Sequence, residues 1–162
     1  MAARYCSNQC YCMYSKQPAT LVRQQFWTAF GQYMRPVISA GGEKINWVNY
    51  KTGIKFIRIS MQCEDGVAFI RIELSHPDTG IQGQQFDELL KLKKQFQESC
   101  GTNWQWLKLN SVGDKKFISS ITACLQNVHV LNQSDWPAII SFLKPRIIAL
   151  DKFWNEYQFA MQ

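Results

Sequence analysis

Apolar side chains recur along the chain at two different spacings, and the change from one to the other predicts an α+β fold. Over residues 18–34 they stand three or four apart, which is typical of one face of an amphipathic helix, and Pro36 ends that helix. Residues 54–61 and 67–74 instead alternate, which predicts two half-buried strands. Between them, Glu64-Asp65-Gly66 predicts the tight turn of a β-hairpin.

The remaining segments predict three more strands and two more helices. The strands are expected over residues 45–50, 104–109 and 117–130. One helix is expected over residues 84–99, and the last begins at Ser134 or Asp135. Pro145 should kink or break this last helix, because proline lacks the backbone donor that a helix interior needs. We therefore predict an α+β fold, with an antiparallel sheet of about five strands packed against an N-terminal, a central and a C-terminal helix.

Composition narrows the class of protein only moderately. A chain of 162 residues with 46% hydrophobic and 19% charged residues is typical of one globular domain. Lys and Arg total 18 against 12 acidic residues, and a net charge of +6 fits a nucleic acid or an acidic partner as well as simple solubility. No apolar run reaches the roughly 18 residues of a membrane span, so we expect a cytoplasmic protein with no membrane contact.

The first residues differ in character from the rest of the chain. Three of the six cysteines, Cys6, Cys10 and Cys12, cluster there, but a zinc site commonly needs a second pair of ligands, and none follows. Met13 resembles a natural beginning. We therefore expect residues 1–12 to be disordered or to precede the true start, residues 13–162 to form the single domain, and no metal or cofactor to be bound.

Motifs for catalysis are weak throughout. The chain contains neither a glycine-rich phosphate loop nor the elbow of a hydrolase, and His76 and His129 are more readily structural or solvated than basic catalysts. A restriction-type nuclease pairs a strand acid with a lysine two residues on, yet Glu73 is followed there by Ser75. The other acid-x-lysine match, Asp114-Lys115-Lys116, belongs to a turn. We therefore lean against an enzyme.

Basic, aromatic and amide side chains gather between the first helix and the hairpin. Lysines can neutralise phosphates while aromatic faces stack on unpaired bases. Arg58 and Arg71 should extend this patch across the outer face of the sheet. The candidate nucleic-acid-binding residues are Lys44, Trp47, Tyr50, Lys51, Lys55, Arg58 and Arg71.

Three other interpretations stay open. The charges could be ordinary solvated groups, with Trp47 and Tyr50 holding the first helix to the sheet. The chain could instead be a protein-interaction module that dimerises or docks through exposed aromatics such as Phe69 and Trp154. A metal-dependent nuclease built on Glu73 is the third and is disfavoured.

The order of several motifs resembles one family. They are Phe26-Trp27 with Phe30, Ile45-Asn-Trp-Val-Asn-Tyr-Lys-Thr-Gly53, Ile72-Glu-Leu-Ser-His-Pro-Asp78, Asp135-Trp-Pro137 and Phe142-Leu-Lys-Pro-Arg-Ile-Ile-Ala-Leu150. Together they resemble the bacterial domain of unknown function 4268, in its stand-alone form, from about Met13 to Tyr157. Relatives of that domain also occur fused behind nuclease-like modules. The resemblance thus implies an accessory role in nucleic-acid processing or defence, and it supplies no catalytic residues.

Overall fold

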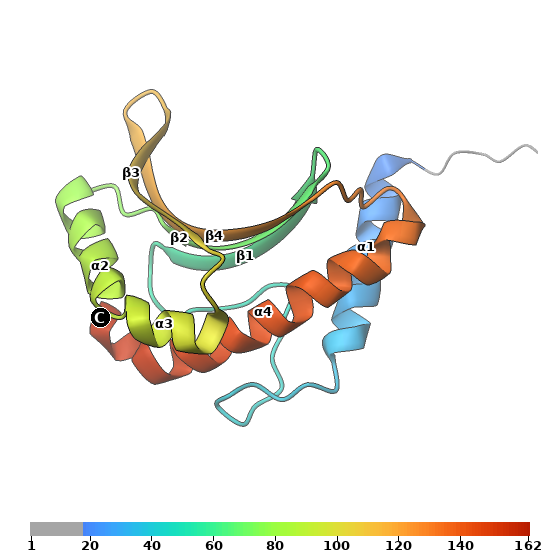
Figure 1. Cartoon of the computed structure of the whole chain (residues 1–162), viewed down its shortest axis with the longest axis horizontal. Helices are drawn as coiled ribbons and strands as arrows, with labels where there is room; N and C mark the ends of the chain where they lie inside the picture. Colours follow the sequence, from blue (N-terminus) through green and yellow to red (C-terminus); the bar gives the residue numbers. More distant parts are fainter. Residues whose placement is uncertain (1–17) are drawn as a thin grey trace, which may run out of the picture.

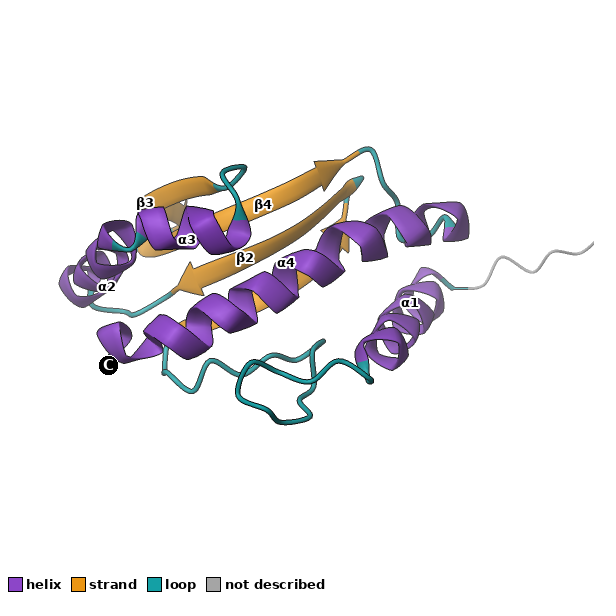
Figure 2. Ribbon diagram, turned by 60° about the horizontal axis from the view of Figure 1, so that its bottom comes forward, coloured by secondary structure: helices purple, strands orange, loops and turns teal. Residues whose placement is uncertain are grey.

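A computed structural model describes residues 18–162, which form four α-helices, two short 3-10 helices and four strands (Figures 1 and 2). The helices are α1 (Ala19–Met34), α2 (Thr79–Lys91), α3 (Lys93–Cys100) and α4 (Trp136–Tyr157), with 3-10 turns η1 (Gln133–Asp135) and η2 (Gln158–Met161). The strands are β1 (Ile57–Glu64), β2 (Val67–Leu74), β3 (Gln105–Gly113) and β4 (Lys116–Gln126). The cysteine cluster and the proposed start at Met13 lie outside the described residues.

The four strands form one antiparallel sheet in the order β1-β2-β4-β3, which confirms the predicted fold class with one strand fewer than expected. The predicted hairpin turn is also present: Asp65 and Gly66 both have positive φ, at 50° and 79°, as the tightest hairpin turns require. The sheet is strongly curved, and α4 and α3 lie against its convex side (Figure 1). Its concave side is the outer face.

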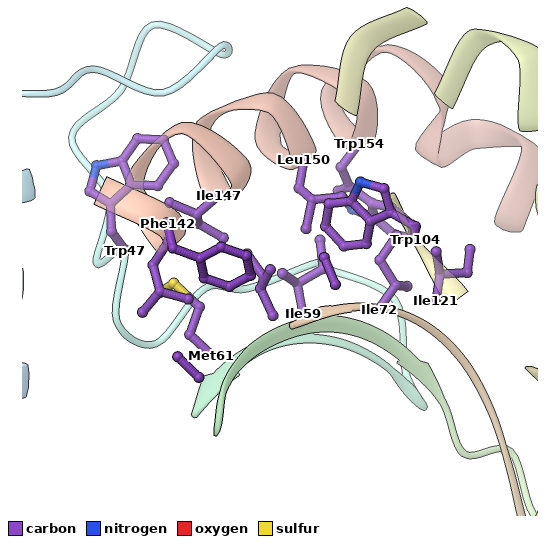
Figure 3. Close-up of a cluster of buried hydrophobic side chains, with 14 of the residues drawn as sticks. Trp47, Ile59, Met61, Ile72, Trp104, Ile121, Phe142, Ile147, Leu150 and Trp154 are labelled. Carbon is purple, nitrogen blue, oxygen red and sulfur yellow. The ribbon is translucent and has the colours of Figure 1, made fainter. Parts of the chain in front are cut away.

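The core lies between the convex face and α4. Every second residue of β2 is fully buried, from Ala68 to Leu74, as the alternation predicts. Side chains from α4, including Phe142, Ile147 and Leu150, point toward the strands (Figure 3). The intervening residues of β2 point to the concave face, beside their partners on β1 and β4; they include Phe69, Arg71 and Glu73.

Residues 45–50, predicted as a strand, form a loop instead. Asn46 Oδ1 accepts a 3.1 Å hydrogen bond from the Asn49 backbone, and the Trp47 indole donates at 3.1 Å to the Val37 carbonyl. Short polar side chains that bond to nearby backbone compete with strand ladders. The segment is therefore fixed by its side chains, and the sheet has four strands rather than five.

Helix α4 continues through Pro145, so of the predicted kink or break the break is absent. The guanidinium of Arg146 donates a 2.9 Å hydrogen bond to the Phe142 carbonyl and lies 4.1 Å from the centre of the Phe142 ring. Because Pro145 is exposed, the carbonyl that its ring leaves without a backbone donor can bond to water.

The predicted helix over residues 84–99 begins earlier and is divided at Leu92, which separates α2 from α3. Asp78 caps the start of α2 by accepting hydrogen bonds of 2.8 and 3.1 Å from the backbone of Gly80 and Ile81. Helix α1 packs at the far end of the molecule, where the rings of Phe26 and Trp136 meet edge to face at 5.4 Å. None of the helices in residues 18–162 is long and apolar enough to cross a membrane.

Candidate functional site

A hollow of about 640 Å³ lies where β1 begins, β2 ends and β4 begins. Among residues 18–162, four basic side chains line it, and the one acidic side chain that does so is Glu73. The basic residues are Lys51, Lys55, Arg58 and Lys116. We call this site the basic hollow. It brings together four of the predicted binding residues, Tyr50, Lys51, Lys55 and Arg58, with Lys116, which the sequence did not indicate as a binding residue.

Glu73 is already engaged by two arginines. Its Oε1 accepts a 2.9 Å hydrogen bond from Arg58, and its Oε2 lies 3.9 Å from the guanidinium of Arg71. Arg58 stands directly opposite Glu73 in the β1–β2 register, and Arg71 lies two residues before it on β2. The guanidinium of Arg71 also covers the Phe69 ring at 4.2 Å. One carboxylate thus pairs with two guanidiniums, so this group of three side chains carries one positive charge in excess.

The three lysines of the basic hollow are exposed and form no ion pair with any carboxylate of residues 18–162. Lys55 lies 4.8 Å from the centre of the Phe56 ring, so part of its ammonium faces an aromatic surface. Lys116 reaches the hollow because β4 pairs with β2, a long-range pairing that no local pattern predicts. Together with Lys51 they present positive charge that the described chain leaves without a partner.

The other predicted residues lie elsewhere. Trp47 is only 2% exposed and its indole N–H is bound to the Val37 carbonyl, so its faces are not open to a base. Lys44 is exposed beside Trp47 and the end of α1, away from the basic hollow. Trp47 therefore has the structural role that was the alternative to binding: its indole anchors the loop.

Tyr50 lies on the wall of the basic hollow and is tied to the last helix. Its hydroxyl donates a 2.7 Å hydrogen bond to Asp151 Oδ1, and Asp151 Oδ2 accepts another, of 2.6 Å, from the Ala40 backbone. Asp151 is 5% exposed. Burial, and then the hydrogen bond to Asp151 and its charge, raise the pKa of Tyr50 well above its ordinary value. The phenol is therefore a fixed, neutral surface.

Backbone geometry fixes the floor of the basic hollow. Phe56 has a positive φ of 65°, which is uncommon for a bulky residue, and its carbonyl accepts a 2.9 Å hydrogen bond from the Ser75 backbone. The Thr52 hydroxyl donates at 2.6 Å to the Ile57 carbonyl, and the Thr52 carbonyl accepts at 2.9 Å from the Trp154 indole. These bonds hold the lysine-bearing segment against both the sheet and α4.

The residues considered for catalysis have structural partners. Ser75, which replaces the nuclease lysine, lies 3.4 Å from the Phe56 carbonyl through its hydroxyl, and His76 Nδ1 accepts from the Asp78 backbone at 3.0 Å. The backbone of His129 donates to Asp135 at 2.9 Å. Within residues 18–162 no three His, Cys, Asp or Glu side chains are grouped so that they could hold a metal ion.

The two aromatics predicted to be exposed docking points are covered to different degrees. Trp154 is 2% exposed and packs in the core, so that prediction is wrong for this residue (Figure 3). Its indole N–H donates a hydrogen bond to the Thr52 carbonyl. Phe69 does lie on the concave face, but it is half-buried beneath the guanidinium of Arg71.

The fold and the site define a small α+β domain with an electropositive hollow at one end of a curved antiparallel sheet. The chain belongs to the family described as Domain of unknown function (DUF4268), whose profile matches residues 22–158, nearly the whole sequence. Searches of curated proteins and of solved structures returned no significant match.

Proposed function

We propose that this domain is a non-enzymatic accessory module that binds nucleic acid through the basic hollow. The observation that carries the proposal is the concentration of four basic side chains around one hollow, namely Lys51, Lys55, Arg58 and Lys116. The one acid that lines it within the described part of the chain, Glu73, is already paired. Phosphate groups are the most common polyanionic partners of such a surface. The role in nucleic-acid processing or defence that the family resemblance implies agrees with this proposal.

The form of the hollow supports an extended polyanion. It is open and lies at the end of the concave face, so that a strand leaving it can continue toward Arg71. Arg58 is 65% exposed at the side chain although it pairs with Glu73, so its guanidinium has donors left for a phosphate. Affinity built on such contacts falls steeply with salt, because each phosphate contact releases counterions.

The test is fluorescence anisotropy with labelled single- and double-stranded DNA and RNA, titrated from about 50 to 300 mM salt. We expect binding at low salt that weakens by orders of magnitude across this range. Lys55→Glu and Lys116→Glu should each weaken binding of every sequence to a similar degree, and each should make the salt dependence shallower.

The matched control is Lys94→Glu, the same charge reversal at an exposed position of α3 that does not line the hollow. It should change affinity much less than Lys55→Glu. If no nucleic acid binds at low salt, or if Lys94→Glu weakens binding as much as the variants of the hollow, the proposal is wrong.

A further inference from the structure

A second pocket shares a wall with the basic hollow. Its volume is about 410 Å³, within the range of about 300–1,000 Å³ that is typical of small-ligand sites. Residues 49–52 line both spaces, so the hollow and the pocket adjoin along this segment. We call it the amide pocket, because four carboxamide side chains line it: Asn46, Asn49, Asn155 and Gln158.

Most of these carboxamides have hydrogen-bonding capacity to spare. Asn46 Oδ1 accepts from the Asn49 backbone, but the side-chain amides of Asn49, Asn155 and Gln158 make no hydrogen bond to any group of residues 18–162. A carboxamide offers a donor and an acceptor side by side. This arrangement complements the edge of an unpaired nucleobase, which also carries adjacent donors and acceptors.

The charge of the amide pocket is opposite to that of the hollow. Of the residues that the structure describes, two carboxylates, Glu43 and Asp151, lie in its wall against one cation, Lys51, which lies on the shared segment. A phosphate placed beside these carboxylates would be repelled, whereas an uncharged polar group would not. A basic space joined to a neutral or acidic one matches a nucleotide, in which a charged phosphate is linked to an uncharged base.

Tyr50 stands between the two spaces and can support a base. It lines both, it is half-buried, and the hydrogen bond to Asp151 fixes its ring. Stacking on such a ring is sequence-tolerant, because every base presents an aromatic face. The carboxamides would then add hydrogen bonds to the edge of the same base.

We propose that the amide pocket takes one unpaired base of a nucleic-acid strand whose phosphates lie in the basic hollow. This inference rests on the proposed function and makes it more specific. A base in a duplex has its edge paired and its faces stacked, so it cannot enter the pocket without leaving the helix. The domain should therefore bind single strands more tightly than duplexes of the same length.

The test compares three labelled DNA probes with the full chain: a single strand of about 12 nucleotides, the same strand with abasic sites, and its duplex. We expect Asn155→Leu to weaken binding of the intact single strand about tenfold, the size of one lost base contact. Binding of the abasic strand and of the duplex should not change, nor should the salt dependence. Gln84→Leu, at an exposed position of α2 that does not line the pocket, is the matched control.

The outcomes separate this inference from the function on which it rests. Suppose that Lys55→Glu weakens binding of all probes while Asn155→Leu and Asn49→Leu weaken binding of none. Nucleic acid then binds at the basic hollow, and the inference that the amide pocket takes a base is wrong. Equal affinity of the parent protein for intact and abasic strands would overturn it as well. If no probe binds at low salt, both proposals fail. Thermal unfolding of each variant checks that a loss of binding is not a loss of folding.

Discussion

Tyr50 and Asp151 lie 101 residues apart in the sequence, yet the tyrosine hydroxyl donates a 2.7 Å hydrogen bond to the aspartate carboxylate. The same carboxylate accepts from the Ala40 backbone through its other oxygen. One buried side chain of α4 therefore fixes two points of the long connection between α1 and β1. That connection carries Lys51 and Lys55, so the shape of the proposed site depends on this contact.

Replacing Asp151 by asparagine should destabilise the domain, although the two side chains have almost the same size and shape. Both carboxylate oxygens accept hydrogen bonds, whereas asparagine keeps one accepting oxygen and replaces the other with an NH2 group, which cannot accept. One donor would be left without a partner in a partly buried place, which costs about 1–3 kcal/mol of unfolding free energy. Urea unfolding of Asp151→Asn measures this. Asn155→Asp, an isosteric change at an exposed position one turn later on α4, is the control and should have a much smaller effect.

The raised pKa of Tyr50 predicts a loss of stability at alkaline pH. Burial is its main cause, followed by the hydrogen bond and charge of Asp151, so the folded state holds the phenolic proton more tightly than the unfolded state does. The contribution of this tighter proton binding to the free energy of unfolding is present in full below the pKa of tyrosine in the unfolded state, about 10. It is lost as pH rises above that value, because only the unfolded state then ionises freely.

The measurement is urea unfolding of the parent protein and of Tyr50→Phe between pH 8 and pH 11. The variant lacks the titrating phenol, so its stability should fall less over this range than that of the parent protein. The other tyrosines and the lysines contribute to both curves alike. Parallel curves would show that Tyr50 ionises equally in the two states.

Glu73 offers a prediction that distinguishes binding from catalysis. It is the only carboxylate among the described residues that line the basic hollow, and it neutralises part of the charge of Arg58 and Arg71. Glu73→Gln should therefore tighten nucleic-acid binding several-fold at low salt and steepen the salt dependence. A nuclease built on Glu73 would instead lose its cleavage activity.

Anisotropy titration and a cleavage assay with added divalent metal, run on the same variant, decide between these outcomes. Glu64→Gln removes the same charge at the last residue of β1, which does not line the basic hollow, and serves as the control. It should leave affinity almost unchanged. Metal-dependent cleavage by the parent protein that Glu73→Gln abolishes would contradict the non-enzymatic proposal.

The three thiols within residues 18–162 should react in an order set by burial. Cys124 is exposed on β4, whereas Cys63 and Cys100 lie among packed side chains. Burial raises the pKa of Cys100 to about 12 and also raises that of Cys63, so neither forms much thiolate at neutral pH. Iodoacetamide at pH 8, followed by peptide mass spectrometry, should label Cys124 before Cys63 and Cys100, which should react only in urea. Labelling of Cys100 as fast as Cys124 in the folded protein would be inconsistent with this structure.

The sequence predicted the elements with strong periodicity and missed features that depend on distant partners. The hairpin, the alternation of β2 and the start of α4 follow from local patterns, and all three are present. The supposed strand over residues 45–50 is a loop because its hydrogen bonds go to side chains and to the segment after α1. Such pairing leaves no periodic trace in the sequence.

The sequence also predicted only part of the candidate site. Lys51, Lys55 and Arg58 are close in the sequence and remain close in space. Lys116 joins them only through the pairing of β4 with β2, and Trp47 is withdrawn into the core by tertiary packing. Local clustering of charge therefore located the hollow, but not all of its wall.

Thr52 provides the last prediction, because it connects the lysine-bearing segment to the rest of the fold. Its hydroxyl donates to the Ile57 carbonyl at 2.6 Å and accepts from the Ile54 backbone at 3.2 Å, while the side chain is 6% exposed. Thr52→Val keeps the shape but leaves these buried groups unpaired, so it should lower the unfolding free energy by about 1–3 kcal/mol. Thr52→Ser keeps the hydroxyl and should cost less.

Binding should follow the same order as stability for these two variants. Thr52 lies on the wall common to the basic hollow and the amide pocket, and its hydroxyl holds Lys51 and Lys55 in register with β1. Thr52→Val should therefore weaken nucleic-acid binding even at temperatures where the variant is fully folded, whereas Thr52→Ser should retain it. Anisotropy titrations below the unfolding transition, beside urea unfolding of both variants, measure the two effects separately. If Thr52→Val were less stable but bound with unchanged affinity, the hydroxyl would support the fold without shaping the site.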